Sequence, residues 1–125
     1  MTLIDTNIIL RYILNDHTEL SKKSIKILEN KNVCIKIEII AEVVYILEKL
    51  YKIPRKEIVS ALQVLFSYKN IEVIEKDVVL FALEIYKSKK IDLIDTILIS
   101  YNKIRNFEIL SFDKDILKNI SAAST

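Results

Sequence analysis

Apolar residues recur along the chain with two spacings, one typical of helices and the other of short strands. Apolar positions three or four residues apart place one side of a helix toward a core. This helical spacing covers residues 7–14, 16–29, 39–51, 54–68, 77–87, 92–104 and 113–119. Short apolar or alternating runs, which favour strands, cover residues 1–5, 33–37, 71–74 and 108–111.

The order of these elements predicts the class of fold. Strands alternate with helices along the chain, and strands connected through helices normally run parallel in one sheet. We therefore predict an α/β fold with a short, mostly parallel sheet that is covered by helices on both faces. No repeat or linker interrupts the pattern, so residues 1–120 are expected to form a single domain and residues 121–125 a frayed tail.

The composition of the 125 residues excludes several kinds of chemistry. The chain has no glycine, so it cannot form a Gly-rich phosphate loop, a dinucleotide-binding turn or a nucleophile elbow, which all need backbone that glycine permits. Its single histidine excludes an HExxH zinc site, and its single cysteine excludes a disulfide framework or a Cys-x-x-Cys pair. Carboxylates are the reactive groups that remain abundant.

Charge and hydropathy give weaker indications. A net charge of +2 is too small by itself to indicate a nucleic-acid-binding protein. The most apolar segment, residues 37–47, contains Glu38 and Glu42, so it is not a membrane span. Because the chain shows no export signal and its Cys34 is unpaired, we expect a cytoplasmic protein.

Two aspartates follow predicted strands. Asp5 ends the first strand and Asp113 follows the last, and parallel strands end at the same edge of a sheet, where α/β folds bind their ligands. Each could instead cap the following helix by accepting hydrogen bonds from its first N–H groups. For either residue alone, capping is at least as good an explanation as catalysis.

Three further acids lie on predicted helices. Asp92 and Asp95 fit a capping box, in which Asp92 is the cap, while Asp95 is equally well explained as a ligand. Glu42 is surrounded by apolar neighbours, and a buried carboxylate has to be paired, neutralised or bound to a cation. A half-exposed helix edge would remove that requirement for Glu42.

Gathered in one cleft, these acids would repel each other, and a divalent cation would relieve the repulsion. Ligands that are all oxygen favour Mg²⁺ or Mn²⁺ over zinc. Such ions polarise a phosphate and activate water, which suits phosphodiester hydrolysis. The polar side chains of Thr6, Asn7 and Ser111 flank two of the acids and could orient them, or could simply form turns and caps.

Four segments resemble motifs of the PIN domain family, and particularly of the VapC-type toxins of prokaryotic toxin–antitoxin pairs. They are residues 3–12 (LIDTNIILRY), 41–47 (AEVVYIL), 92–99 (DLIDTILI) and 110–115 (LSFDKD). The resemblance implies a PIN-like three-layer α/β/α sandwich with a short central sheet. It also implies a hydrolase, an endoribonuclease that uses magnesium (or Mn²⁺) to cut RNA, a homodimer, and inhibition by a small antitoxin protein.

Motif matching assigns particular residues to this activity. The family's catalytic and metal-binding acids fall on Asp5, Glu42, Asp95 and Asp113, with Asp92 as a candidate extra acid. Of the quartet, Glu42 is expected to hold a second ion or a metal-bound water. The supporting polar positions fall on Thr6, Asn7 and Ser111. Arg11 matches a position that is often basic in the family, and we give it no catalytic role.

Other readings remain beside the nuclease. A catalytically degenerate PIN-like module that binds RNA or a protein partner without cleavage is the main alternative. A phosphatase of the haloacid-dehalogenase type is rejected because Asn7 stands where that class needs an aspartate, and a receiver domain because no pair of acids precedes a strand-end aspartate. Residues 120–123 match the family's short final strand poorly, so that strand is expected to be missing or altered.

The remaining residues of interest have simpler explanations. His17 is expected at the surface and Cys34 in the core. The helices at 39–51 and 54–68 have more apolar residues than one sheet face requires, and we favour a dimer interface or antitoxin groove over ordinary core. The residues behind this interpretation are Leu50, Tyr51, Leu65, Phe66 and Tyr68.

Overall fold

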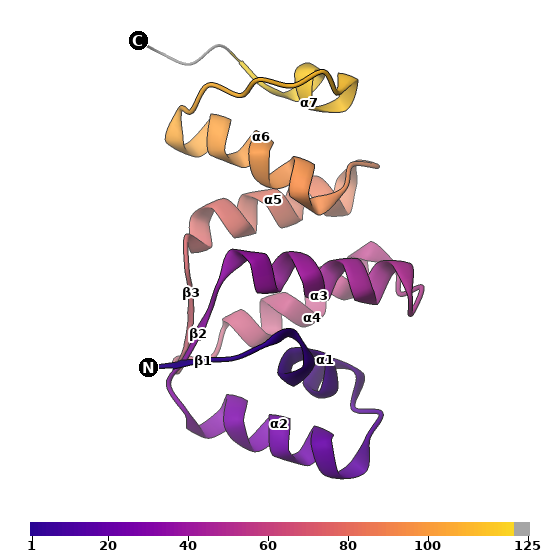
Figure 1. The fold of residues 1–125 in the computed structure, drawn as a ribbon, viewed down its shortest axis with the longest axis vertical. Coiled ribbons are helices and arrows are strands. Elements are labelled where there is room, and N and C mark those ends of the chain that lie inside the picture. The colour runs from indigo at the N-terminus through magenta and orange to yellow at the C-terminus, as the bar shows by residue number, and fades with distance from the viewer. Residues whose placement is uncertain (122–125) are drawn as a thin grey trace. The chain divides into compact units, whose positions relative to one another are not determined.

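The computed structural model describes residues 1–121 (Figure 1). The chain divides into two compact units, Met1–Ile74 and Glu75–Thr125. The first contains the sheet with four helices, and the described part of the second contains three helices. The α/β class and the short parallel sheet predicted from the sequence are confirmed, and the elements are consistent with a three-layer α/β/α sandwich.

The sheet of the first unit consists of three parallel strands in the order β1, β2, β3. Their bounds are β1 (Thr2–Leu3), β2 (Val33–Ile35) and β3 (Ile71–Val73). All three residues of the central strand β2 are buried, because both of its edges are paired and both of its faces are covered. Leu3 pairs with Cys34, and Cys34 with Glu72, so the strands are nearly in step where Asp5 follows β1.

Four amphipathic helices complete this unit. They are α1 (Thr6–Leu14), α2 (Thr18–Asn30), α3 (Ile37–Lys49) and α4 (Arg55–Phe66). Helix α1 packs against α2 and α3, α3 packs against α4, and α4 packs against β3. The predicted start near Pro54 is confirmed, with Pro54 at the N-cap position, where its missing N–H costs nothing. Core side chains from these elements include Ile9, Leu28, Ile35, Ile40, Leu47 and Leu62.

The second unit is helical over its described residues. Its helices are α5 (Lys76–Ser88), α6 (Leu93–Arg105) and α7 (Lys114–Asn119), and α6 packs against both α5 and α7. Isoleucines build part of its core: Ile91, Ile99 and Ile116 are buried, and partly buried neighbours pack against them. Those neighbours are Ile85, Ile109 and Ile120.

The strand predicted at 108–111 is wrong: this segment forms no strand in the structure. Its alternation has a different cause, because Ile109 packs against the isoleucine cluster while Leu110 is 85% exposed. The described residues of the second unit contain no strand with which it could pair, and an extended segment without a ladder partner is not a strand.

The C-terminal segment was expected to fray from residue 121 onward. Ser121 is held in place, because its N–H donates to Oδ1 of Asn102 at 2.9 Å and its carbonyl accepts from Nδ2 of Asn102 at 2.7 Å. Neither Ile120 nor Ser121 lies in a strand. The rest of the expected tail, and of the expected strand at 120–123, lies outside the described residues.

The glycine-free chain places other residues in left-handed backbone. Asn15 and Asn106 adopt positive φ at the C-caps of α1 and α6, where asparagine is the usual substitute for glycine. Lys52 and Glu75 also have positive φ, of 56° and 53°. Their side chains are disfavoured in this region, so these two turns store local strain.

Candidate functional site

Asp5 lies between β1 and α1 and caps the helix. Its backbone is extended, and its carboxylate accepts a hydrogen bond from the N–H of Ile8 at 3.4 Å. The capping interpretation is therefore confirmed. The bond uses only Oδ1, and the side chain is exposed, so capping leaves the second carboxylate oxygen accessible to a ligand.

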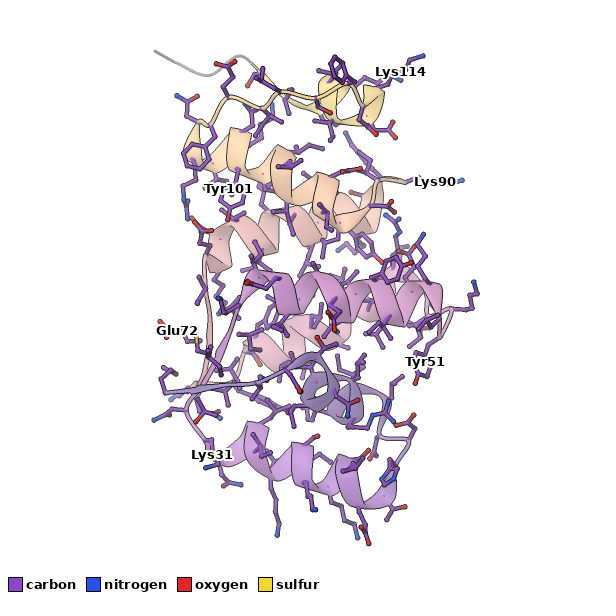
Figure 2. All side chains as sticks on the ribbon, in the orientation of Figure 1. Lys31, Tyr51, Glu72, Lys90, Tyr101 and Lys114 are labelled. Atoms are coloured by element: carbon purple, nitrogen blue, oxygen red, sulfur yellow. The ribbon has the colours of Figure 1, made fainter. Side chains whose placement is uncertain are left out.

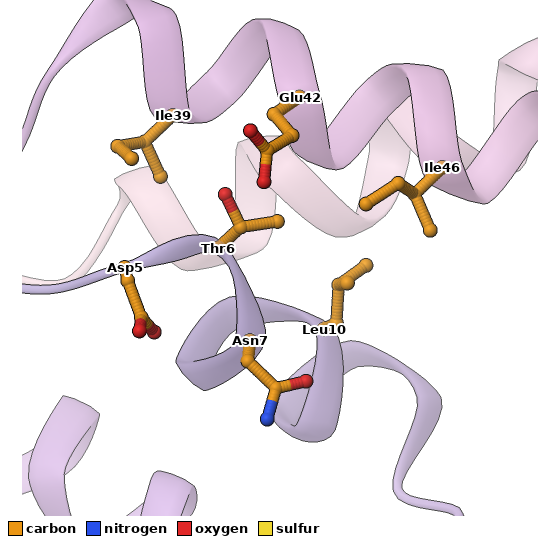
Figure 3. Close-up of a pocket in the computed structure, with 7 residues that line it drawn as sticks. All are labelled: Asp5, Thr6, Asn7, Leu10, Ile39, Glu42 and Ile46. Atoms are coloured by element: carbon orange, nitrogen blue, oxygen red, sulfur yellow. The ribbon is translucent and has the colours of Figure 1, made fainter.

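Asp5 also lines a pocket of about 440 Å³ between α1 and α3 (Figure 3). The carboxylate of Glu42 extends from α3 toward Thr6, whereas the carboxylate of Asp5 points away from Glu42. Polar groups and aliphatic walls thus share one concave surface. Its lining residues are Asp5, Thr6, Asn7, Leu10, Ile39, Glu42 and Ile46.

Glu42 is not buried, because its side chain is exposed. It lies on the face of α3 that lines the pocket, between the half-buried Ile39 and Ile46, and Tyr45 beside it is 62% exposed. Because the pocket is open to water, the carboxylate needs no partner to be stable there. The half-exposed edge, given above as the alternative, describes its position.

The second unit holds a separate group of acids. Asp95 lies in the first turn of α6 and is half-buried. Burial raises the pKa of Asp95, and the charges of Asp113, Asp92 and Asp115 raise it further, in that order. These three carboxylates are therefore close enough to disfavour the charge of Asp95, a cost that a nearby cation would remove.

Capping was expected for Asp92 and was one of two interpretations for Asp113. Asp113 caps α7, accepting hydrogen bonds from the N–H groups of Asp115 at 2.8 Å and Ile116 at 3.1 Å. Its own N–H donates to Oγ of Ser111 at 2.9 Å, which fixes the turn. Asp92 occupies the N-cap position of α6, but its side chain makes no capping hydrogen bond, so the predicted capping box does not form.

The structure therefore brings the predicted acids together in pairs within each unit. Asp5 and Glu42 line one pocket, and Asp95 lies within electrostatic reach of Asp113 and Asp92, whose charges raise its pKa. The convergence of all four in one cleft stays a prediction. Their oxygen donors suit Mg²⁺ or Mn²⁺ in chemistry. Among residues 1–121, however, no group of three or more His, Cys, Asp or Glu side chains is arranged to hold a metal ion.

Sequence reasoning missed several contributors. Asp115 was not a candidate, although its position two residues after Asp113 was the available signal. Leu10 forms part of the aliphatic wall of the pocket and was also missed, although it lies three residues after Asn7 on the same helix face. Ile39 and Ile46 form the rest of that wall, and both were expected beside Glu42 from helical spacing.

Three expectations about other residues can be judged. His17 is exposed, as expected, and it also caps α2 through Nδ1, which accepts from the N–H of Leu20 at 3.1 Å. Cys34 is buried in β2, as expected. Leu65 and Phe66, counted toward an interface, are ordinary core.

Comparison with known proteins agrees with the motifs. The profile of one family, described as PIN domain, matches residues 2–122. No curated protein and no solved structure matches the chain. Within residues 1–121, no helix has the length and apolar character needed to cross a bilayer. Because the family match spans nearly the whole chain, the protein belongs to the PIN domain family.

Proposed function

We propose that the protein is an endoribonuclease that depends on Mg²⁺ or Mn²⁺ and hydrolyses phosphodiester bonds in RNA. PIN domains are generally nucleases and typically depend on divalent metals. One observation carries the proposal. The four predicted acids fall two in each unit: Asp5 and Glu42 line one pocket, and the charge of Asp113 acts on Asp95 and raises its pKa.

The carboxylates have different roles in this proposal. Asp5, Asp95 and Asp113 are the principal metal-binding groups, Glu42 serves a second ion or orients water, and Asp92 is an extra acid. A bound divalent ion would polarise the scissile phosphate and lower the pKa of a coordinated water.

The neighbouring polar side chains would serve to orient these acids. Ser111 already accepts the N–H of Asp113, which holds that carboxylate at the start of α7. Thr6 is buried at the pocket beside the exposed Asn7, and these two side chains can steer Asp5 and Glu42.

RNA cleavage with Mg²⁺ or Mn²⁺ tests the assignment. Asp5→Asn and Asp95→Asn should each lower kcat/KM by about 100-fold or more, because each removes a metal-binding charge. Glu72→Gln and Glu108→Gln are matched controls, since each neutralises an exposed acid outside the quartet, one in each unit. Wild-type rates in the two aspartate variants would refute the assignment.

We further propose that the protein is the toxin of a VapC-type toxin–antitoxin pair and that it forms a homodimer. Support comes from the C-terminal end of α3, where Tyr45 and Leu50 are 62% and 70% exposed, and Tyr51 beyond them is 44% exposed. Large apolar side chains gathered in water are a feature of interfaces. Sedimentation should show a dimer, and a monomer at high concentration would refute the homodimer. A small upstream reading frame encoding a DNA-binding protein would support the antitoxin.

A second candidate is a degenerate PIN module that binds RNA or protein without cleaving. It is favoured by one finding: among residues 1–121, no group of three or more His, Cys, Asp or Glu side chains is arranged to hold a metal ion. Titration with Mn²⁺ separates the two functions. An active nuclease should bind the ion, and should lose affinity in Asp95→Asn, whereas a degenerate module should not bind it.

A further inference from the structure

Arg11 on α1 has a mostly buried guanidinium group with no part in the function proposed above. Nη1 donates to Oδ1 of Asp16 at 2.6 Å, and Nη2 donates to the hydroxyl of Tyr51 at 3.4 Å. Nε is buried and lacks a hydrogen-bond partner among residues 1–121. Only 16% of the side chain is exposed. Burying a guanidinium is costly, so its two bonds have to offset that cost.

The bond to Tyr51 connects the two walls of the pocket. Arg11 lies in the last turn of α1, directly after Leu10, which lines the pocket. Tyr51 follows the C-terminal end of α3 (Figure 2). The N–H of Tyr51 donates to the carbonyl of Ile46 at 3.2 Å, and Ile46 lines the opposite wall. The guanidinium therefore links the end of one wall to the end of the other.

The bond to Asp16 fixes the turn that follows α1. Asn15 adopts left-handed backbone there and its N–H donates to the carbonyl of Arg11 at 3.0 Å. Asp16 comes next and accepts the guanidinium. The hydrogen bond to Tyr51 and the charge of Asp16 raise the pKa of Arg11, although burial lowers it. The guanidinium therefore keeps its positive charge.

We infer that Arg11 is a positioning residue: by joining Asp16 and Tyr51, it holds α1, with Asp5 at its start, opposite Glu42 on α3. The consequence for catalysis rests on the proposed function. A lysine at this position would keep the charge near Asp16 but would lack the planar fork that reaches two partners at once. Arg11→Lys should therefore keep part of the link between α1 and α3, and Arg11→Met should abolish it.

Arg55 provides a matched control. Its Nε contacts Oε2 of Glu48 at 2.9 Å, and 20% of its side chain is exposed, close to the value for Arg11. This pair joins α4 to α3 and does not involve α1. Arg55→Met thus removes a comparable guanidinium–carboxylate pair while leaving the link between α1 and α3 intact.

Hydrogen exchange of the amides in residues 6–14 tests the link independently of any activity. Arg11→Met should accelerate their exchange about 10-fold and Arg11→Lys less, while Arg55→Met should leave them at the wild-type rate. Tyr51→Phe, which removes only one hydroxyl, should accelerate exchange a few-fold and serves if Arg11→Met does not fold. Wild-type exchange in residues 6–14 of both Arg11→Met and Tyr51→Phe would overturn the inference.

RNA cleavage then tests whether the link positions the acids. Arg11→Met should lower kcat about 10-fold with little change in KM, Arg11→Lys should restore part of it, and Arg55→Met should keep the wild-type kcat. An equal loss in Arg11→Met and Arg55→Met would overturn the positioning role. If the wild-type protein neither binds Mn²⁺ nor cleaves RNA, the proposed function fails, and the exchange comparison alone decides whether Arg11 holds α1.

Discussion

Asp5 and Glu42 in the first compact unit and Asp95 in the second are acids in different surroundings. In the first unit, Asp5 caps α1 and Glu42 lines the pocket from α3, and both are exposed to water. In the second, Asp95 is half-buried among Asp92, Asp113 and Asp115, and its pKa is raised. The same kind of side chain therefore stabilises the fold where it caps a helix in water, and costs stability where burial and like charges surround it.

This contrast gives a way to separate stability from function. Removing a charge should weaken a metal site in either unit, but its effect on folding should depend on whether the acid is a cap or a crowded neighbour. Substitutions at Asn102, at the cap Asp5 and at the half-buried Asp95 separate these effects.

Asn102→Ala should have the largest effect on stability. Asn102 is 3% exposed, its Nδ2 donates to the carbonyls of Phe107 and Ser121, and its Oδ1 accepts from the N–H of Ser121. Truncation leaves these backbone groups without partners, at a cost of about 2 kcal/mol in the free energy of unfolding. Urea denaturation measures it.

The exposed Asn30 is the control, because its Nδ2 donates only to the carbonyl of Lys26, one turn earlier in α2. Asn30→Ala should change the free energy of unfolding by less than about 0.5 kcal/mol. Equal stabilities for the two alanine variants would show that Asn102 does not anchor the C-terminal segment.

Asp5→Ala should have an intermediate effect, a loss of about 1 kcal/mol, because it removes the cap of α1. Asp5→Asn should cost almost nothing, since asparagine caps helices as well as aspartate does. Urea denaturation without metal compares the two. A similar loss in both variants would mean that the charge of Asp5, rather than its hydrogen bond to Ile8, stabilises the helix.

Asp95→Asn should have the smallest effect on stability and the opposite sign, a gain of about 0.5 kcal/mol at pH 7 without metal, because it removes like-charge repulsion. The folded state raises the pKa of Asp95, so the wild-type protein is favoured while Asp95 is protonated and loses that advantage as pH rises through the raised pKa. The gain should therefore be small at pH 4 and larger at pH 7.

Asp77 provides the contrasting pH dependence. Its hydrogen bonds to Arg105 lower the pKa of Asp77 to about 2, so its contribution is present above the ordinary aspartate pKa and is lost as pH falls toward 2. Asp77→Asn should therefore lose stability at pH 7.

A gain in Asp95→Asn that does not change between pH 4 and pH 7 would show that repulsion is not its cause.

The features predicted from the sequence are those determined by neighbours along the chain. The helix predicted at 77–87 is Lys76–Ser88, and that predicted at 92–104 is Leu93–Arg105. Apolar spacing and capping residues are local, so a single sequence contains them. The caps at Asp5 and Asp113 were among the alternatives for the same reason.

The errors concern features that depend on distant partners or on helix rotation. Segment 108–111 alternates like a strand, but only a partner strand would make it one, and a pattern in one segment does not supply that partner. The apolar neighbours of Glu42 left burial and a half-exposed edge both open, and its side chain is exposed on the face of α3 that lines the pocket. His17 was missed as a cap because histidine is not among the usual capping residues.

The absence of glycine has a consequence for the unfolded protein as well as for the folded one. Glycine has the most backbone freedom to lose on folding, so a chain without it begins folding from a narrower ensemble. The absence of glycine also strains the turns at Lys52 and Glu75, because residues with a β-carbon there adopt conformations that glycine would accept freely. The chain therefore loses less backbone entropy on folding, and part of the conformational cost falls on the turns at Lys52 and Glu75.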